Sequence, residues 1–314
     1  MDEATVAVPL WAWAAVGAVI AVMLAIDVLM HRDSHVIELR EAVVWSAVWI
    51  SAGLLFGLVV WFGLGGEPAS AYFSGYLLEK ALSVDNVFVF ALIFGYFRVP
   101  PGYQHKVLFW GVVGALVFRL LFILAGAELL DRLSWAAFVL GAFLVWTGWR
   151  LAVRGKPDVD PERNLVVRLF RRVVPTDAQY HGDRFTTRVA GRRQATLLLV
   201  TLVAIEATDV VFAIDSVAAI LAITTNTFLV WTATAFAVLG LRSLYFCLAG
   251  LLRHFGYLRY GLALLLAFAG VKLILAETPV GKLPVWLTLA VVVLILAVSI
   301  AASIRAIRRG RDVA

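Results

Sequence analysis

Long hydrophobic runs, separated by short polar stretches, dominate the pattern along this chain of 314 residues. A helix that spans a bilayer needs about 20 mostly apolar residues, and runs of that length recur throughout the sequence. Nine such runs occupy residues 8–29, 42–62, 70–96, 107–127, 134–153, 195–221, 227–252, 259–276 and 284–304. The pattern predicts an all-α polytopic membrane protein with about nine transmembrane helices, in a single domain covering residues 1–314.

Composition and charge support this assignment and predict an orientation. Hydrophobic residues make up 62% of the chain and charged residues 15%, whereas soluble domains carry about 25% charged residues. With nine spans and a cytoplasmic C-terminus, 21 lysines and arginines fall in inside segments and two in outside segments. Cytoplasmic loops carry such an excess, so we expect the N-terminus outside and the C-terminus inside. The net charge of +6 then suits anionic lipids at the cytoplasmic side, and not nucleic acid.

The longest polar segment is a basic cytoplasmic loop at residues 154–194. Within it, the stretch "RNLVVRLFRRVV" (163–174) has the period of an amphipathic helix, with an apolar face and a basic face. The apolar face holds Leu165, Val166, Leu169, Phe170 and Val173, and the basic face holds Arg168, Arg171 and Arg172. This pattern favours a helix at the cytoplasmic lipid surface, with packing on the protein as the alternative. A homo-oligomer or another membrane partner also stays open.

Nine charged residues lie inside the predicted spans and away from their ends. Five are acidic and four are basic: Glu79, Asp85, Glu206, Asp209 and Asp215, with Lys80, Arg119, Arg242 and Lys272. A charge at the centre of a transmembrane helix costs about 2.5–3.5 kcal/mol, so these groups must face one another or a wet cavity. The four basic residues are expected to compensate the charge of the acids. Asp27 lies near the end of its span and is expected to be solvated.

The two acidic motifs are related to each other in sequence. Aligning "EKALSVDNV" (79–87) with "DVVFAIDSV" (209–217) pairs Glu79 with Asp209, Asp85 with Asp215, and Asn86 with Ser216. In each copy the next span carries an arginine and the third span carries "GWRL" (148–151) or "GVKL" (270–273). A unit of three spans is upside down in its second copy. We therefore predict two inverted three-helix repeats, at residues 70–153 and 195–276.

If the two motif helices cross antiparallel near the midplane, their acids form one central site. Glu79 would lie level with Asp215, and Asp85 with Asp209, in two layers about 9 Å apart. The predicted ligands of a transported cation are Glu79, Asp85, Asn86, Glu206, Asp209 and Asp215. Oxygen ligands of this kind suit Mg²⁺, Ca²⁺ or Mn²⁺, and the histidines lie in loops or at span ends.

Clustered carboxylates release protons when a metal ion binds, which predicts proton/metal antiport. Two other functions stay open. Arg119 and Arg242 could bind an oxyanion such as tellurite, or the charges could form structural salt bridges in a membrane scaffold. No HExxH or GxSxG motif occurs, so we do not expect an enzyme or a permanently bound cofactor.

Several stretches resemble one known family. They are "EKALSVDNVFVFALIFGYFRVP" (79–100), "QHKVLFWGVVGALVFR" (104–119), "IEATDVVFAIDSVAAILAIT" (205–224) and "FAVLGLRSLYF" (236–246). They are similar to the TerC/Alx family of bacterial membrane proteins. The resemblance implies a multi-pass inner-membrane protein linked to tellurium resistance and manganese export, with the family's acidic motif residues at Glu79, Asp85, Asp209 and Asp215.

The chain departs from the pattern of many members of that family at three positions. Ala218 stands where many members have proline, Thr234 where many have asparagine, and Asn226 where many have aspartate. These changes remove a helix break and some polar oxygen atoms, which bears on the affinity for the ion and on its identity.

Overall fold

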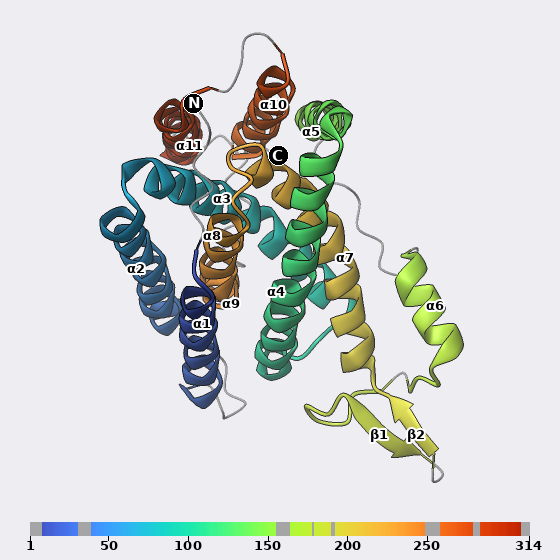
Figure 1. Cartoon of the computed structure of the whole chain (residues 1–314). Helices are drawn as coiled ribbons and strands as arrows, with labels where there is room; N and C mark the ends of the chain where they lie inside the picture. The colour runs from blue at the N-terminus through green and yellow to red at the C-terminus, as the bar shows by residue number, and fades with distance from the viewer. Residues whose placement is uncertain are drawn as a thin grey trace.

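A computed structural model describes residues 8–30, 39–154, 164–177, 179–189, 192–248, 258–278 and 283–308, and in them α-helices predominate (Figure 1). The helices are α1 (Leu10–Met30), α2 (Leu39–Leu64), α3 (Gly66–Phe97), α4 (Pro101–Arg132), α5 (Ser134–Arg154), α6 (Leu165–Val173), α7 (Leu197–Leu221), α8 (Thr227–Leu239), α9 (Leu241–Leu248), α10 (Leu258–Ala276) and α11 (Val285–Arg308). Two antiparallel strands, β1 (Thr186–Val189) and β2 (Arg192–Ala195), precede α7.

Each predicted apolar run corresponds to a helix, or, for residues 227–252, to the pair α8 and α9. In the described part of the chain, seven helical segments are long and apolar enough to cross a membrane. They lie in α1, α2, α4, α5, α7, the α8–α9 pair and α11. The polar helix α3 is not among them, and the apolar stretch of α10 is shorter. An all-α polytopic membrane protein is thus confirmed, whereas nine spans, the orientation and the repeats stay predictions.

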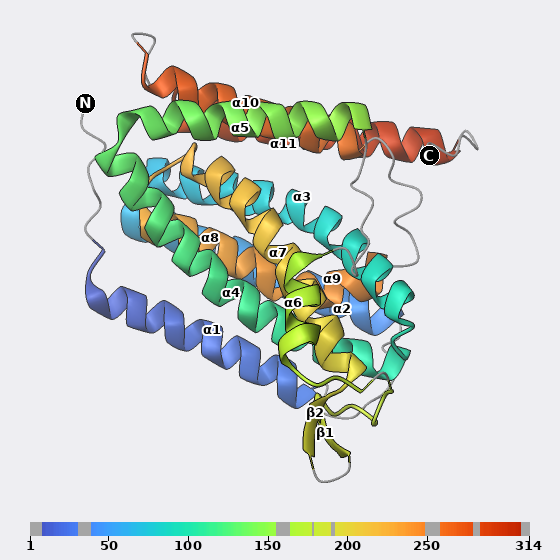
Figure 2. The same ribbon diagram turned by 90° about the vertical axis from the view of Figure 1, so that its right-hand side faces the viewer.

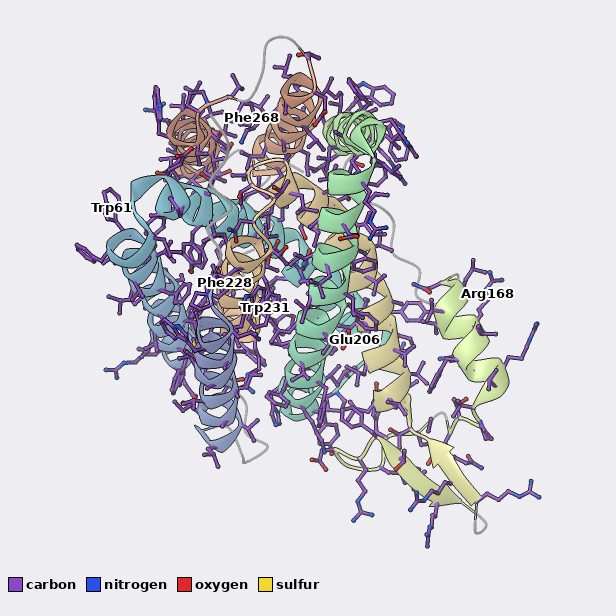
Figure 3. All side chains as sticks on the ribbon, in the orientation of Figure 1. Trp61, Arg168, Glu206, Phe228, Trp231 and Phe268 are labelled. Carbon is purple, nitrogen blue, oxygen red and sulfur yellow. The ribbon has the colours of Figure 1, made fainter. Side chains whose placement is uncertain are left out.

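Helix α8 lies at the centre of the bundle. Every residue from Phe228 to Leu239 except Trp231 is buried, and α1, α2, α3 and α4 all pack against this helix. Figure 3 labels Phe228 and Trp231 on this central helix. A helix that is apolar on all sides requires such burial. The outer helices α1, α2 and α11 instead expose large apolar side chains, as lipid contact requires: Leu10, Val59, Phe62, Leu294 and Val298.

Helix α3 carries the first acidic motif through the protein interior. It begins after Gly65, which has a φ of 99°, a conformation that favours glycine. It ends at Arg98, which adopts the left-handed conformation, and Pro101 then starts α4. The hydroxyl of Ser74 donates to the carbonyl of Ser70 one turn back, so this polar side chain is satisfied within the helix.

Helices α5, α10 and α11 form a layer across one side of the bundle, with α10 between the other two (Figures 1 and 2). Glycines allow α5 and α10 to approach closely. A Cβ atom on Gly270 would lie 2.5 Å from the carbonyl oxygen of Gly141, and one on Gly148 would lie 2.5 Å from that of Ala263. Gly148 and Gly270 are the glycines of the two related motifs "GWRL" and "GVKL". Small residues at this crossing provide the close packing that holds membrane helices together.

The described part of the basic loop folds into α6 and the β1–β2 hairpin, which lie beside and below α7 in Figure 1. The sequence pattern predicted the helix but missed the hairpin. Two hydrogen bonds help to attach this segment to the bundle. The Tyr180 hydroxyl donates to the carbonyl of Phe97 at 2.8 Å, and Lys106 Nζ donates to Asp183 Oδ2 at 2.9 Å. The hydrogen bond from Lys106 lowers the pKa of Asp183.

Replacing Gly270 by alanine tests the α5–α10 packing. The added methyl group must push the two backbones apart, so we expect a loss of roughly 1–3 kcal/mol in stability. Gly17→Ala in α1 is the matched control because nothing lies within 4 Å of its added Cβ. Thermal unfolding in detergent measures both variants. Equal melting temperatures for Gly270→Ala and Gly17→Ala would contradict the close contact.

Candidate ion site between α3, α4 and α7

A buried arginine of α4 joins the two helices that carry the acidic motifs. Arg119 is 1% exposed and forms a hydrogen-bonded ion pair with Glu79 of α3. Its Nη2 donates to Asp209 Oδ1 of α7 at 3.3 Å, and its Nη1 donates to Ser216 Oγ at 3.2 Å. One guanidinium therefore ties three helices together inside the protein.

Each motif helix presents two residues to this cluster, seven positions apart. They are Glu79 and Asn86 on α3, and Asp209 and Ser216 on α7. Asn86 Nδ2 donates to Asp209 Oδ1 at 3.3 Å, while Glu79 and Ser216 share Nη1 of Arg119. The first residue of each pair thus lies beside the second residue of the other, so the helices run in opposite directions where they meet. Seven residues make nearly two helical turns, which places both members of a pair on one face.

The structure places Asp215 at α5 and not beside Glu79. Its Oδ1 accepts a hydrogen bond from Thr147 Oγ1 at 3.4 Å, and the residue is only partly buried. The next residue, Ser216, takes the position near Glu79 that we expected for Asp215. The reason is helical geometry, because a residue six positions after Asp209 points about 120° away from it. Asp85 belongs to α3, but its side chain lies outside the described part of the structure.

Glu206 lies between α4 and α7, one turn before Asp209 on α7 (Figure 3). Its carboxylate occupies space that a side chain at Gly114 of α4 would fill, because a Cβ there would collide with it. Glycine at position 114 therefore makes room for this acid. The sequence pattern did not reveal Gly114, since glycines are common in membrane-spanning helices and most of them only allow close packing.

Three buried carboxylate oxygens of this region have no hydrogen-bond partner among the described residues: Glu79 Oε2, Glu206 Oε2 and Asp209 Oδ2. Buried oxygens without partners are costly, so they mark places where a proton, a cation or water is needed. Among the described side chains, however, no three His, Cys, Asp or Glu residues lie close enough together to hold a metal ion. In this arrangement Glu79 and Asp209 hold the Arg119 guanidinium.

Lys80 of α3 and Lys272 of α10 each donate to a backbone carbonyl near the end of another helix. Lys80 Nζ donates to the carbonyl of Ala237 at 2.9 Å, just before the break between α8 and α9 at Gly240. Lys272 Nζ donates to the carbonyl of Ile223 at 3.3 Å, just after the end of α7. Cations are favourable at such C-terminal helix ends, so both lysines have a structural role beside the predicted one of charge compensation.

Arg242 pairs with Asp27, and not with the acids of the central cluster. Its Nη1 lies 3.1 Å from Asp27 Oδ2, which joins α9 to α1. Asp27 is 6% exposed, so the expectation that this residue is solvated is wrong. The physical reason is that Asp27 lies on the face of α1 that meets Arg242 of α9, whereas its neighbours Val28 and Leu29 are exposed. Of the four predicted compensating cations, Arg119 is the one that contacts Glu79 and Asp209 among the described side chains.

A hollow of about 630 Å³ lies between the start of α3 and the turn that joins α7 to α8. Its polar lining comes from Glu67 and from the turn residues Thr224, Thr225, Asn226 and Thr227. Asn226 also caps α8, because its side chain accepts a hydrogen bond from the backbone N–H of Leu229 at 3.2 Å. Carboxylate, hydroxyl and amide oxygens thus gather at one end of the α3–α8 pair.

Removing Arg119 tests the role of the cluster in stability. Arg119→Met leaves Glu79 and Asp209 buried without their cation, so we expect a loss of about 3–5 kcal/mol. Adding Glu79→Gln and Asp209→Asn to that variant should recover much of the loss, because no buried charge is then left unpaired. Arg132→Met is the control: its exposed pair with Glu128 contributes about 0–1 kcal/mol. Unfolding in detergent measures these effects, and a neutral Arg119→Met would contradict the cluster.

Comparisons with known proteins place the chain in a family. A model of the "Integral membrane protein TerC family" matches residues 64–311. The uncharacterized membrane protein STKORF319 of Myxococcus xanthus is 44% identical over 93% of this chain and 91% of its own length. The protein Alx of Salmonella typhi, whose name proposes a membrane-bound redox modulator, is 39% identical over 94% of both chains. No solved structure matches. The chain therefore belongs to the TerC family of integral membrane proteins.

Proposed function

We propose that this protein exports a divalent metal cation, Mn²⁺ first among them, through the cluster between α3, α4 and α7. The observation that carries the proposal is a pair of carboxylates held by one guanidinium, Glu79 and Asp209, with a third acid, Glu206, one helical turn from Asp209. Each of the three has a buried oxygen that lacks a partner among the described residues. With all three acids ionised, the cluster holds one positive charge against three negative ones. A divalent cation would correct that imbalance, and carboxylate oxygens suit Mn²⁺.

Arg119 acts in this proposal as a tethered cation that occupies the carboxylates when no ion is bound. An incoming ion competes with the guanidinium for Asp209 and draws on Glu206, one turn away on the same helix. Asn86 donates to Asp209 through its Nδ2, and a rotation of its amide group would present the amide oxygen to the ion. Asp85 and Asp215 would serve as further ligands along the path.

In this proposal the ion path opens to the outside at the hollow beside Glu67 and Asn226. The protein lies in a bacterial inner membrane with its C-terminus in the cytoplasm. The positive-inside distribution of lysine and arginine supports that orientation.

Two other functions explain fewer of the contacts and unpaired oxygens in this cluster. An oxyanion such as tellurite would need a free cation, but both terminal nitrogens of Arg119 are engaged by carboxylates. A purely structural salt bridge explains the contacts of Arg119 but not the carboxylate of Glu206, which lies in a glycine niche without a described partner for its Oε2. A redox role would need a group other than an internal disulfide, since the chain has one cysteine.

Cellular manganese content tests the proposal. Bacteria that express the wild-type chain should tolerate more Mn²⁺ and contain less of it than cells with an empty vector. Asp209→Asn, Asp215→Asn and Asp85→Asn should each abolish the effect while the protein still reaches the membrane. Asp183→Asn, in the segment beside the hairpin, is the matched control and should export normally. Wild-type cells that retain as much manganese as the vector control would overturn the proposal.

Proton coupling gives a second test. Metal ions bind deprotonated ligands, so each Mn²⁺ that enters should displace protons from the carboxylates. In proteoliposomes we expect Mn²⁺ movement in one direction and proton movement in the other, with an apparent affinity that rises with pH and then levels off. A pH dye inside the vesicles measures the proton flux. Mn²⁺ transport that is independent of pH and moves no protons would reject antiport.

A further inference from the structure

The short helix α6 exposes a row of large apolar side chains. Leu165 is 72% exposed, Val166 53%, Leu169 62% and Val173 71%, whereas Val167 is 1% exposed. Four large hydrophobic residues on nine positions form more than the scattered apolar surface that is common on proteins. A partner is therefore expected to cover this row.

Three arcs divide the circumference of α6. At about 100° per residue, the exposed apolar residues share one arc roughly 100° wide. Val167 and Phe170 occupy the next arc, where the helix packs against the protein and contacts α7. The remaining arc holds the three exposed arginines, Arg168, Arg171 and Arg172. The apolar arc thus lies between a face that is anchored to the protein and a face that is positively charged.

Contacts from the anchored face and from Arg171 fix α6 near the ends of two helices of the bundle. The guanidinium of Arg171 lies over the ring of Phe97, 5.9 Å from its centroid, and Phe97 is the last residue of α3. Asn164 caps α6, since its side chain accepts a hydrogen bond from the N–H of Val166 at 2.9 Å. In Figure 2 the helix lies in front of α7, near the end of that helix from which the β1–β2 hairpin extends.

The charge of this segment indicates which partner covers the apolar row of α6. Residues 164–174 contain three arginines and no acid, and residues 184–195 add four more arginines and no acid. A positive arc beside an apolar arc is the pattern of a helix in the interface of an anionic membrane. The chain belongs to a family of integral membrane proteins, and α6 packs against α7, which is long and apolar enough to cross a bilayer, so a bilayer surface lies within reach of α6.

We propose that α6 lies in the lipid interface, where Leu165, Val166, Leu169 and Val173 insert among the acyl chains. Arg168 and Arg172 contact the phosphates of anionic phospholipids, while Arg171 keeps its place over Phe97. The loop thereby binds the bilayer on one side and the ends of α3 and α7 on the other. The inference does not depend on which substrate the protein carries.

Site-directed fluorescence in lipid nanodiscs tests this inference on the full chain. Leu169→Cys is made in a Cys247→Ser background and labelled, and Thr186→Cys on the exposed β1 strand is the matched control. Lipids with a quencher on the upper acyl chain should quench the label at position 169 several-fold more strongly than the label at position 186. Replacing neutral lipid with phosphatidylglycerol should increase the quenching at position 169.

The double variant Arg168→Gln/Arg172→Gln should keep the fold but lose most of the dependence on phosphatidylglycerol. Two results would overturn the inference. The label at position 169 could be as accessible to water as the label at position 186. Alternatively, it could escape lipid quenching and crosslink to a second copy of the chain, which would make α6 a protein interface.

Discussion

The contact of one buried guanidinium with two carboxylates is the interaction on which the arrangement of this protein depends. Arg119 of α4 holds Glu79 of α3 and Asp209 of α7, and each of the three residues is at most 2% exposed. None of these charges could be buried alone without a large desolvation cost. The three helices must therefore assemble together, and the polar motif of α3 is stable only inside the bundle.

That constraint explains the layout around the cluster. The polar helix α3 packs between α7 and the apolar helix α8, while outer helices cover it with surfaces that suit lipid. Glycine permits the tightest approaches: Gly114 makes room for Glu206, and Gly141 with Gly270 brings α5 against α10. The other three cations of the spans bind elsewhere: Lys80 and Lys272 donate to carbonyls near the ends of α8 and α7, and Arg242 pairs with Asp27.

Much of the helical architecture could be predicted from the sequence because apolar runs of bilayer length seldom occur outside membrane-spanning helices. The pairing of the two motifs was also visible, but the inward-facing residues were not all identified. The spacing of seven between Glu79 and Asn86, repeated in Asp209 and Ser216, was the available signal, because that spacing keeps two residues on one face. The Asp27–Arg242 pair joins α1 to α9 across 215 positions, and no local pattern reveals a contact of that kind. The hairpin was missed because its strands have four residues each.

Direct binding of Mn²⁺ to the purified protein tests the central claim that the cluster around Arg119 is a cation site. Free Mn²⁺ gives a six-line electron paramagnetic resonance signal that falls when the ion is bound. Wild-type protein should remove Mn²⁺ from solution saturably, and Glu206→Gln or Asp209→Asn should weaken binding at least tenfold, whereas Asp183→Asn should not. Equal binding by all four proteins would place the metal elsewhere and leave the cluster as a structural salt bridge.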